Sequence, residues 1–133
     1  EKSKKAKNIE FKGWLNKQEL KKELLNCTIG LSAYTKNATQ SIPNKPIEYL
    51  AYGIPQICSL PGEMRQLLES RNAGLYYKAN DARSLADKIL HLANDVNSLN
   101  QMSISSTELF EDKFNIKDSH QKFNTLINTI TKQ

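Results

Sequence analysis

The sequence predicts an α/β domain, a doubly wound parallel sheet of about four strands with helices on both faces. Short apolar runs alternate with amphipathic stretches of helical period, and Gly, Pro, Asn and Asp separate the runs. Parallel strands need long connections, and each connection here contains a predicted helix. We therefore expect right-handed crossovers, and ligands beyond the carboxyl ends of the strands.

Composition fits one globular domain over 1–133, because the chain has 133 residues with 38% apolar and 25% charged content. No apolar run reaches the roughly 18 residues of a membrane span, and no signal peptide with an apolar core is present. We expect a cytoplasmic protein. Cys27 and Cys58 lack the spacing of zinc or thiol-disulfide sites, so both are predicted to be buried, reduced thiols.

The net charge of +5 is concentrated near the start, where residues 1–7 form a lysine-rich leader. Such a run can attract anionic lipid or nucleic acid, although a solvated leader followed by the outer face of a helix is the favoured explanation. No aromatic residues alternate with these lysines, as a stacking platform for nucleic acid would need. We expect no nucleic-acid partner and leave peripheral contact with the inner face of the plasma membrane open.

The first third of the chain predicts two strands and a helix. Asn8–Lys12 alternates polar and apolar residues and stops at Gly13, as an edge strand does. Asn16 to Glu19 is a capping box that opens a helix. Thr28–Ala33 has apolar residues on alternate positions and is predicted to be the second strand.

A polar loop over Tyr34–Pro43 leads into a helix over Lys45–Tyr52, with Pro46 in its first turn and Gly53 just past its end. Strands over Pro55–Ser59 and Leu75–Tyr77 follow, with a helix over Glu63–Ser70 between them. Asp81 caps a further helix, and two more close the chain. The predicted buried helix positions are Leu20, Leu24, Leu25, Ile47, Leu50, Ala51, Met64, Leu67, Leu68, Leu85, Ala86, Ile89, Leu90, Ala93, Leu99, Met102, Leu109, Phe123, Leu126, Ile127 and Ile130.

The loop and helix start after the second strand suit a phosphorylated ligand. A helix that begins near Lys45 offers free backbone N–H groups and the positive end of its dipole, and Lys45 adds a full charge. Glu48 is predicted at the third helical position, where a carboxylate can accept hydrogen bonds from a vicinal diol such as a ribose. Capping of the helix explains a first-turn glutamate as well.

At these residues the sequence resembles a known family. Pro43-Asn-Lys-Pro-Ile-Glu-Tyr-Leu-Ala-Tyr-Gly-Ile-Pro55 is similar to the nucleotide-sugar-binding segment of retaining glycosyltransferases of the GT-B fold, family 4, the glycosyl transferases group 1. The family's order is also followed by Phe11-Lys-Gly13, Glu63, Asn72-Ala-Gly74 and Asp81 to Ala86. The resemblance covers about residues 8 to 130.

The resemblance implies a Rossmann-like donor domain that binds a nucleoside diphosphate sugar without a metal or other cofactor. Glu48 matches the second glutamate of the family's Glu-x7-Glu motif and is expected to bind the ribose hydroxyls. The loop from Ser41 through Pro43 and Asn44 to Lys45 is expected to hold the diphosphate. Gly13 and Trp14 match the segment beside the nucleobase, although Trp14 is equally explained as an anchor in the core.

Two departures from the family limit these expectations. Gln40 stands where the first glutamate of the motif would fall, so its contact with the donor sugar carries no charge. The family's opening strand and helix, with the basic pair that neutralises the leaving group, would precede residue 1, as would the acceptor-binding domain. We therefore expect a fragment that binds donor weakly and is inactive by itself.

The whole protein is accordingly expected to be a retaining, hexosyltransferase-type enzyme of surface polysaccharide biosynthesis, which transfers sugar to a glycan or lipid-linked acceptor held by the other domain. Two alternatives remain. The first is a non-catalytic nucleotide-sugar-binding module that lost activity with the glutamate at position 40. The second is a basic module that docks on membrane or nucleic acid.

Overall fold

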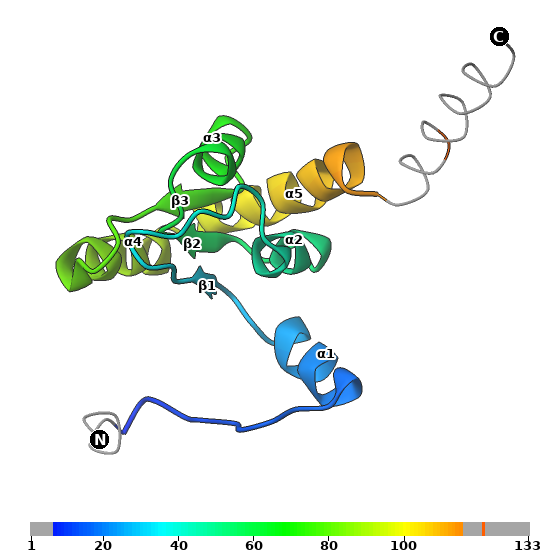
Figure 1. Cartoon of the computed structure of the whole chain (residues 1–133). Helices are drawn as coiled ribbons and strands as arrows, with labels where there is room; N and C mark the ends of the chain where they lie inside the picture. The colour runs from blue at the N-terminus through cyan, green and yellow to red at the C-terminus, as the bar shows by residue number, and fades with distance from the viewer. Residues whose placement is uncertain (1–6, 116–120, 122–133) are drawn as a thin grey trace, which may run out of the picture.

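The computed structural model describes residues 7–115 and residue 121. Its sheet has three parallel strands in the order β1-β2-β3, namely β1 (Gly30–Ser32), β2 (Gln56–Cys58) and β3 (Gly74–Tyr76). The helices are α1 (Lys17–Leu25), α2 (Asn44–Ala51), α3 (Glu63–Ser70), α4 (Ala82–Asn94) and α5 (Val96–Lys113), as labelled in Figure 1.

Two apolar clusters pack against the sheet, and neighbouring residues of β2 point into different ones. Cys58 belongs to the cluster that contains Leu50 of α2 and Met64 of α3. Ile57 belongs to the cluster that contains Leu92 of α4. Because successive side chains of a strand point to opposite faces, helices cover both faces of the sheet. The predicted α/β class with a doubly wound parallel sheet is confirmed.

Helix α5 crosses the edge of the sheet where the strands begin (Figure 1). The Ser103 hydroxyl donates to the backbone oxygen of Gly53, at 2.7 Å, and the Ser106 hydroxyl donates to that of Ala73, at 3.2 Å. Gly53 precedes β2 and Ala73 immediately precedes β3, so these bonds tie α5 to the amino ends of both strands. The opposite edge, with the carboxyl ends, is therefore the edge that α5 does not occupy.

A buried glutamine fixes the start of α2 against the sheet. Gln56 of β2 is fully buried; its amide donates to the backbone oxygen of Pro46, at 3.1 Å, and accepts from the Ser32 hydroxyl of β1, at 3.3 Å. Buried polar groups are stable only when they are hydrogen-bonded, and this side chain satisfies groups on three elements at once. The first turn of α2 therefore has a defined position relative to β1 and β2.

The ends of α2 agree closely with the sequence prediction. The helix runs over Asn44–Ala51, and Gly53 beyond it has φ +63°. A positive φ suits glycine, which is why Gly53 ends the helix. Leu50 is buried as predicted, Ile47 is half-buried, and Ala51 is exposed. The strands predicted over Pro55–Ser59 and Leu75–Tyr77 correspond to β2 and β3.

The strand predicted over Asn8–Lys12 is wrong. These residues form no strand, Ile9 is 52% exposed and Phe11 is 76% exposed. A single strand has no partner for its backbone N–H and C=O groups, so alternation alone does not stabilise it. The sheet of the described residues consequently has three strands rather than about four.

Two predicted apolar faces are also wrong. In β1, Gly30 and Ser32 are buried whereas Leu31 is exposed, because the Tyr49 ring of α2 packs on Gly30, where an added Cβ would lie 2.7 Å from a ring carbon. In α4, Leu92 is the fully buried side chain; Ile89 and Leu90 are exposed. The short strands offer a narrow surface, so a helix of 13 residues buries only a narrow line of side chains.

The capping predictions hold. Asn16 and Glu19 form the expected capping box of α1, and Asp81 accepts from the Ser84 backbone N–H at the start of α4.

The predicted apolar face of α1 is mostly exposed: only Leu24 is buried, and Leu20 and Leu25 are exposed. The helix predicted around Phe123, Leu126, Ile127 and Ile130 lies outside the described residues.

Candidate functional site

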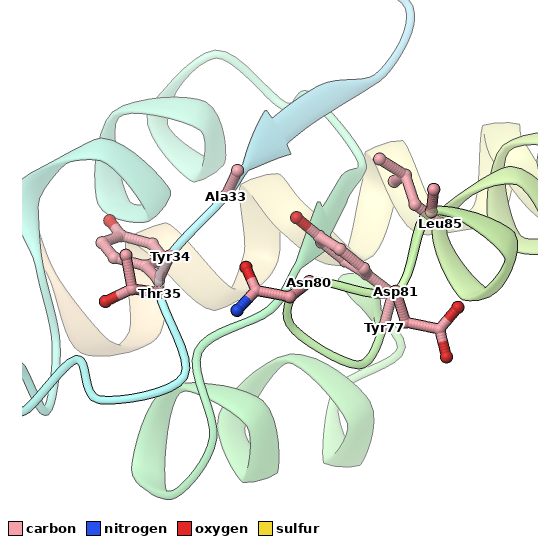
Figure 2. A pocket seen from close by; sticks show the side chains of 8 residues that line it. Ala33, Tyr34, Thr35, Tyr77, Asn80, Asp81 and Leu85 are labelled. Atoms are coloured by element: carbon pink, nitrogen blue, oxygen red, sulfur yellow. The ribbon is translucent and has the colours of Figure 1, made fainter.

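A cavity of about 420 Å³ opens at the carboxyl ends of β1 and β3. Tyr34 and Thr35 contribute one side of it in the view of Figure 2, Asp81 and Leu85 the other, and the Asn80 side chain lies between them. We call it the aromatic cavity, because two tyrosines line it. Its lining residues are Ala33, Tyr34, Thr35, Tyr77, Asn80, Asp81, Ala82 and Leu85.

A second cavity, of about 370 Å³, adjoins the first at Asn80 and lies at the carboxyl ends of β2 and β3. We call it the cationic cavity, because two lysines and no carboxylate line it. Its lining residues are Lys36, Ser59, Pro61, Tyr76, Lys78, Ala79 and Asn80.

The loop after β1 is anchored where it passes the sheet. The Ser59 hydroxyl accepts from the Tyr34 backbone N–H, at 2.7 Å, and donates to the Tyr34 backbone oxygen, at 2.9 Å. Ser59 is fully buried and Tyr34 is half-buried, so both bonds are partly shielded from water. Tyr34 and Thr35 therefore enter the loop from a fixed point at the sheet edge.

The start of α2 leaves backbone donors free of any side-chain cap. Pro43 is the N-cap and has no side-chain hydrogen-bond capacity; Asn44 and Lys45 are the first helical residues, and Pro46 carries no N–H. The first N–H groups of a helix have no intrahelical partner. Asn44 and Lys45 therefore present two backbone donors at the positive end of the dipole, and both residues are exposed.

Lys45 is directed along its own helix. Its ammonium lies over the ring of Tyr49, 5.9 Å from the centroid. This distance is at the outer limit of a cation–π contact, so the interaction is weak at an exposed site. A flexible lysine can leave such a position for an anion at the helix start.

The predicted position of Glu48 is wrong by two residues. Because α2 begins at Asn44, Glu48 is its fifth residue, and no acidic residue lies in the first turn. Capping therefore does not explain this glutamate, since a capping carboxylate must reach back from the third position. Glu48 is exposed, and its carboxylate forms no hydrogen bond or ion pair with residues 7–115.

Ser41 connects the loop to the next helix. Its hydroxyl donates a hydrogen bond to the carboxylate of Glu63, the first residue of α3. Gln40 precedes it in the chain and is exposed. Glu63 thus has a hydrogen-bond partner as well as a favourable place at a helix start.

The proposed nucleobase residues lie in a different part of the molecule. Gly13 and Trp14 belong to the segment before α1, which extends away from the sheet in Figure 1. Trp14 is 96% exposed, so the interpretation of Trp14 as a core anchor is wrong. The structure brings residues 40–45 and Glu48 together around the start of α2, and it leaves Gly13 and Trp14 apart from them.

The two cysteines differ. Cys58 is buried as predicted, and burial raises the pKa of its thiol, although the Leu60 backbone N–H, 3.4 Å from Sγ, acts in the opposite direction. Cys27 is exposed, which contradicts the prediction, because it follows α1 on the segment that packs little against the sheet. Burial also raises the pKa of Tyr34 and Tyr49.

Sequence reasoning missed most residues of both cavities. Asn80 has φ +62°, a conformation that favours Asn and Gly, so a turn was detectable there but a cavity wall was not. Lys36 and Lys78 belonged to no recognisable sequence motif.

Within residues 7–115 and 121, no group of three or more His, Cys, Asp or Glu side chains is placed to hold a metal ion. The helices described there include none that is long and apolar enough to cross a bilayer.

Two solved structures have the same fold. They are crystal structures of Anabaena Alr3699/HepE, one in complex with UDP and one in complex with UDP-glucose, with TM-scores of 0.71 and 0.69. Each is 16% identical to this chain and matches 84% of it. The chain spans about 30% of the length of those proteins. No curated protein matches this chain in sequence.

The family comparison extends over most of the described fold. The model for glycosyl transferases group 1 matches residues 1–95, which include all three strands, the loop after β1 and the helices α1 to α4. The GT-B domain that the sequence resemblance implied is therefore confirmed at the level of family and fold. This chain belongs to the glycosyl transferases group 1 family.

Proposed function

We propose that this domain binds the nucleoside diphosphate sugar of a retaining, family 4 glycosyltransferase at the start of α2. The observation that carries the proposal is the exposed, uncapped helix start with Lys45 and Glu48 beside it. Family membership and the fold shared with a protein that was crystallised with UDP and UDP-glucose support it.

Each residue has a distinct task in this proposal. The backbone N–H groups of Asn44 and Lys45 donate to the diphosphate, since a helix start combines free donors with a favourable dipole. The Lys45 ammonium adds a charge there. The Glu48 carboxylate accepts from two vicinal ribose hydroxyls, and both of its oxygens are free to do so because no group of residues 7–115 or 121 pairs with them.

The sugar itself is contacted without a charge. Gln40 offers an amide where the family has a carboxylate, so it exchanges hydrogen bonds with sugar hydroxyls as a neutral group. Ser41 keeps this part of the loop against α3 through its bond to Glu63. The proposed binding mode uses no metal, and backbone donors and Lys45 offset part of the phosphate charge.

The transfer step belongs to the whole protein. An acceptor must be held against the anomeric carbon, and the charge of the leaving diphosphate must be stabilised as the bond breaks. The proposed enzyme transfers a hexose to a glycan or lipid-linked acceptor in polysaccharide biosynthesis, on the cytoplasmic side of the membrane. The sugar-accepting group of the acceptor is held by a further domain, and the domain described here is inactive alone.

A second candidate function is a non-catalytic nucleotide-sugar-binding module. The neutral Gln40 favours it, because the family's contact to the donor sugar is a carboxylate. A basic docking module is less well supported: Lys12 pairs with Glu10 at 3.0 Å and with Glu23 at 3.6 Å, so part of the basic charge near the start of the described chain is neutralised.

Calorimetric titration with UDP, GDP, ADP and UDP-glucose tests the proposed function. Binding of at least one nucleotide, retained in 0.5 M salt at about the same order of affinity, supports a donor site rather than a diffuse charge effect. Salt-sensitive binding to anionic vesicles or oligonucleotides with no nucleotide response would instead support the docking module. A full-length protein that binds donor but neither hydrolyses nor transfers it would support the non-catalytic module.

A further inference from the structure

The cationic cavity is separate from the start of α2, although both lie at the carboxyl edge of the sheet. Ser59 follows β2 and Lys78 follows β3, whereas Lys36 lies on the loop that leads from β1 to α2. No residue from 40–48 lines the cavity. The cavity therefore has no task in the donor contacts described above.

The charge of the cavity is unbalanced. Lys36 and Lys78 line it, and neither ammonium forms an ion pair with a carboxylate of the described residues. A neighbouring depression of about 310 Å³ is different, because its two basic and two acidic side chains offset one another; it is lined by Asp81, Arg83, Ser84, Asp87 and Lys88. Two unpaired cations around one cavity attract an anion into it.

Further donors surround the same space. The Arg65 guanidinium stacks on the Tyr76 ring, 4.1 Å from its centroid, while its Nε donates to Glu69 at 2.9 Å. The guanidinium is thereby held against Tyr76, a residue that lines the cavity. Helix α3 begins at Glu63, and its N-cap, Gly62, follows Pro61 and supplies no side-chain hydrogen bond. The surroundings thus combine cationic groups and free backbone N–H groups, the set that phosphate oxygens require.

We propose that the cationic cavity binds a phosphate group of the acceptor, distinct from the diphosphate of the donor. Lys36 donates to its oxygens from the loop after β1, Lys78 donates from the segment after β3, and Asn80 donates from the boundary with the aromatic cavity. The aromatic cavity accommodates the organic part that carries the phosphate. The assignment to the acceptor rests on the proposed function, whereas the phosphate site rests only on the charges and shape of the cavity.

Titration of the ¹⁵N-labelled chain with inorganic pyrophosphate tests the proposal by NMR. The expected result is a saturable shift of the Lys36, Lys78 and Asn80 amide resonances. The double variant with Lys36→Ala and Lys78→Ala should bind roughly tenfold more weakly, because two charge-assisted hydrogen bonds are lost and each contributes a factor of about three at an exposed site. Both lysines are exposed, so the variant is expected to fold.

Lys88→Ala is the matched control, since it removes a lysine from the charge-balanced depression. It should leave pyrophosphate binding unchanged. Equal weakening by Lys88→Ala and by the double variant would overturn the proposal, because general charge would then explain the binding. Pyrophosphate shifts confined to the amides of Asn44 and Lys45 would also overturn it and would leave the donor proposal intact.

A competition experiment separates the two proposals. Saturating UDP should leave the pyrophosphate shifts at Lys36 and Lys78 in place if the two sites are independent. Pyrophosphate binding at the cavity without any UDP binding would support this inference and contradict the proposed donor site. Displacement of the cavity shifts by UDP would assign the cavity to the donor and overturn the acceptor assignment.

Two further probes identify the source of the phosphate. Farnesyl diphosphate is compared with pyrophosphate in the same titration. Tighter binding of farnesyl diphosphate, with shifts of the Tyr34 and Tyr77 amide resonances as well, supports an isoprenoid-linked acceptor that also fills the aromatic cavity. Equal affinity supports a soluble phosphate ester. If the chain binds phosphatidylglycerol vesicles and responds to neither soluble probe, the assignment of a phosphate site to the cavity is overturned. The two lysines would then contact a lipid surface.

Discussion

Ser41 donates a hydrogen bond to the carboxylate of Glu63, and this bond joins the loop before α2 to the first residue of α3. The two residues are 22 positions apart in the chain. Both are exposed, so the bond stabilises the fold little. Its effect falls on the loop that leads to the proposed diphosphate contacts.

Ser41→Ala should therefore loosen the loop without unfolding the protein. We expect the free energy of unfolding to change by less than about 1 kcal/mol, while amide hydrogen exchange accelerates over residues 41–45. Glu63→Gln should retain slow exchange because its amide oxygen still accepts. Ser70→Ala is the control, since the Ser70 hydroxyl donates within its own helix to Leu67. Unchanged exchange in Ser41→Ala would mean that the bond does not order the loop.

The buried Gln56 gives the clearest stability prediction. Gln56→Leu removes the partner of the Pro46 carbonyl and of the Ser32 hydroxyl in a fully buried place. We expect a loss of about 1–3 kcal/mol in the free energy of unfolding, measured by urea denaturation. Gln66→Leu, on the exposed side of α3, should change it by less than about 0.5 kcal/mol. Equal losses would contradict the role of the Gln56 network.

Trp14 provides a spectroscopic probe, because it is the only tryptophan and is 96% exposed. Its fluorescence should be that of a water-exposed indole, and Trp14→Ala should leave thermal stability nearly unchanged. If Gly13 and Trp14 border the nucleobase, addition of a bound nucleotide should alter the emission. An unaltered emission under saturating nucleotide would remove Trp14 from the site.

The buried thiol and tyrosines predict a loss of stability at high pH. Burial raises the pKa of Cys58 above its ordinary value of 9.0, and those of Tyr34 and Tyr49 above 10.0. As pH rises past about 9, the unfolded chain releases these protons before the folded one does, so the free energy of unfolding falls. Urea midpoints measured from pH 7 to 10.5 should decline above pH 9, and less so in Cys58→Ala. A midpoint that rises over this range would contradict the assignment.

The sequence predicted best where a local signal was sufficient. The Asn16 capping box, the Asp81 cap and the end of α2 at Gly53 depend on neighbouring residues, and all three are present in the structure. The prediction of a strand over Asn8–Lys12 was wrong because a strand needs a partner that its own residues cannot supply. The prediction of which side of β1 is buried was wrong because the ring of Tyr49 occupies the space beside Gly30.

Prediction of the candidate site also succeeded where the signal was local and failed where it was not. Residues 40–48 were found because they form one continuous segment that resembles the family. The two cavities were missed because their walls come from three separate strand ends, so Lys36, Lys78 and Asn80 meet only in the folded chain. Glu48 was placed two residues too early because nothing in the sequence showed that α2 begins at Asn44 rather than near Pro46.

The central claim, donor binding at the start of α2, depends most on Glu48. Calorimetry with whichever nucleoside diphosphate sugar binds the chain should compare Glu48→Ala with Glu108→Ala, an exposed glutamate on α5 that lies in neither cavity. We predict that Glu48→Ala loses about 2 kcal/mol of binding free energy, as expected when a carboxylate no longer accepts from the ribose hydroxyls, and that Glu108→Ala binds like the unsubstituted chain. Binding that is equally tight in Glu48→Ala would contradict the account.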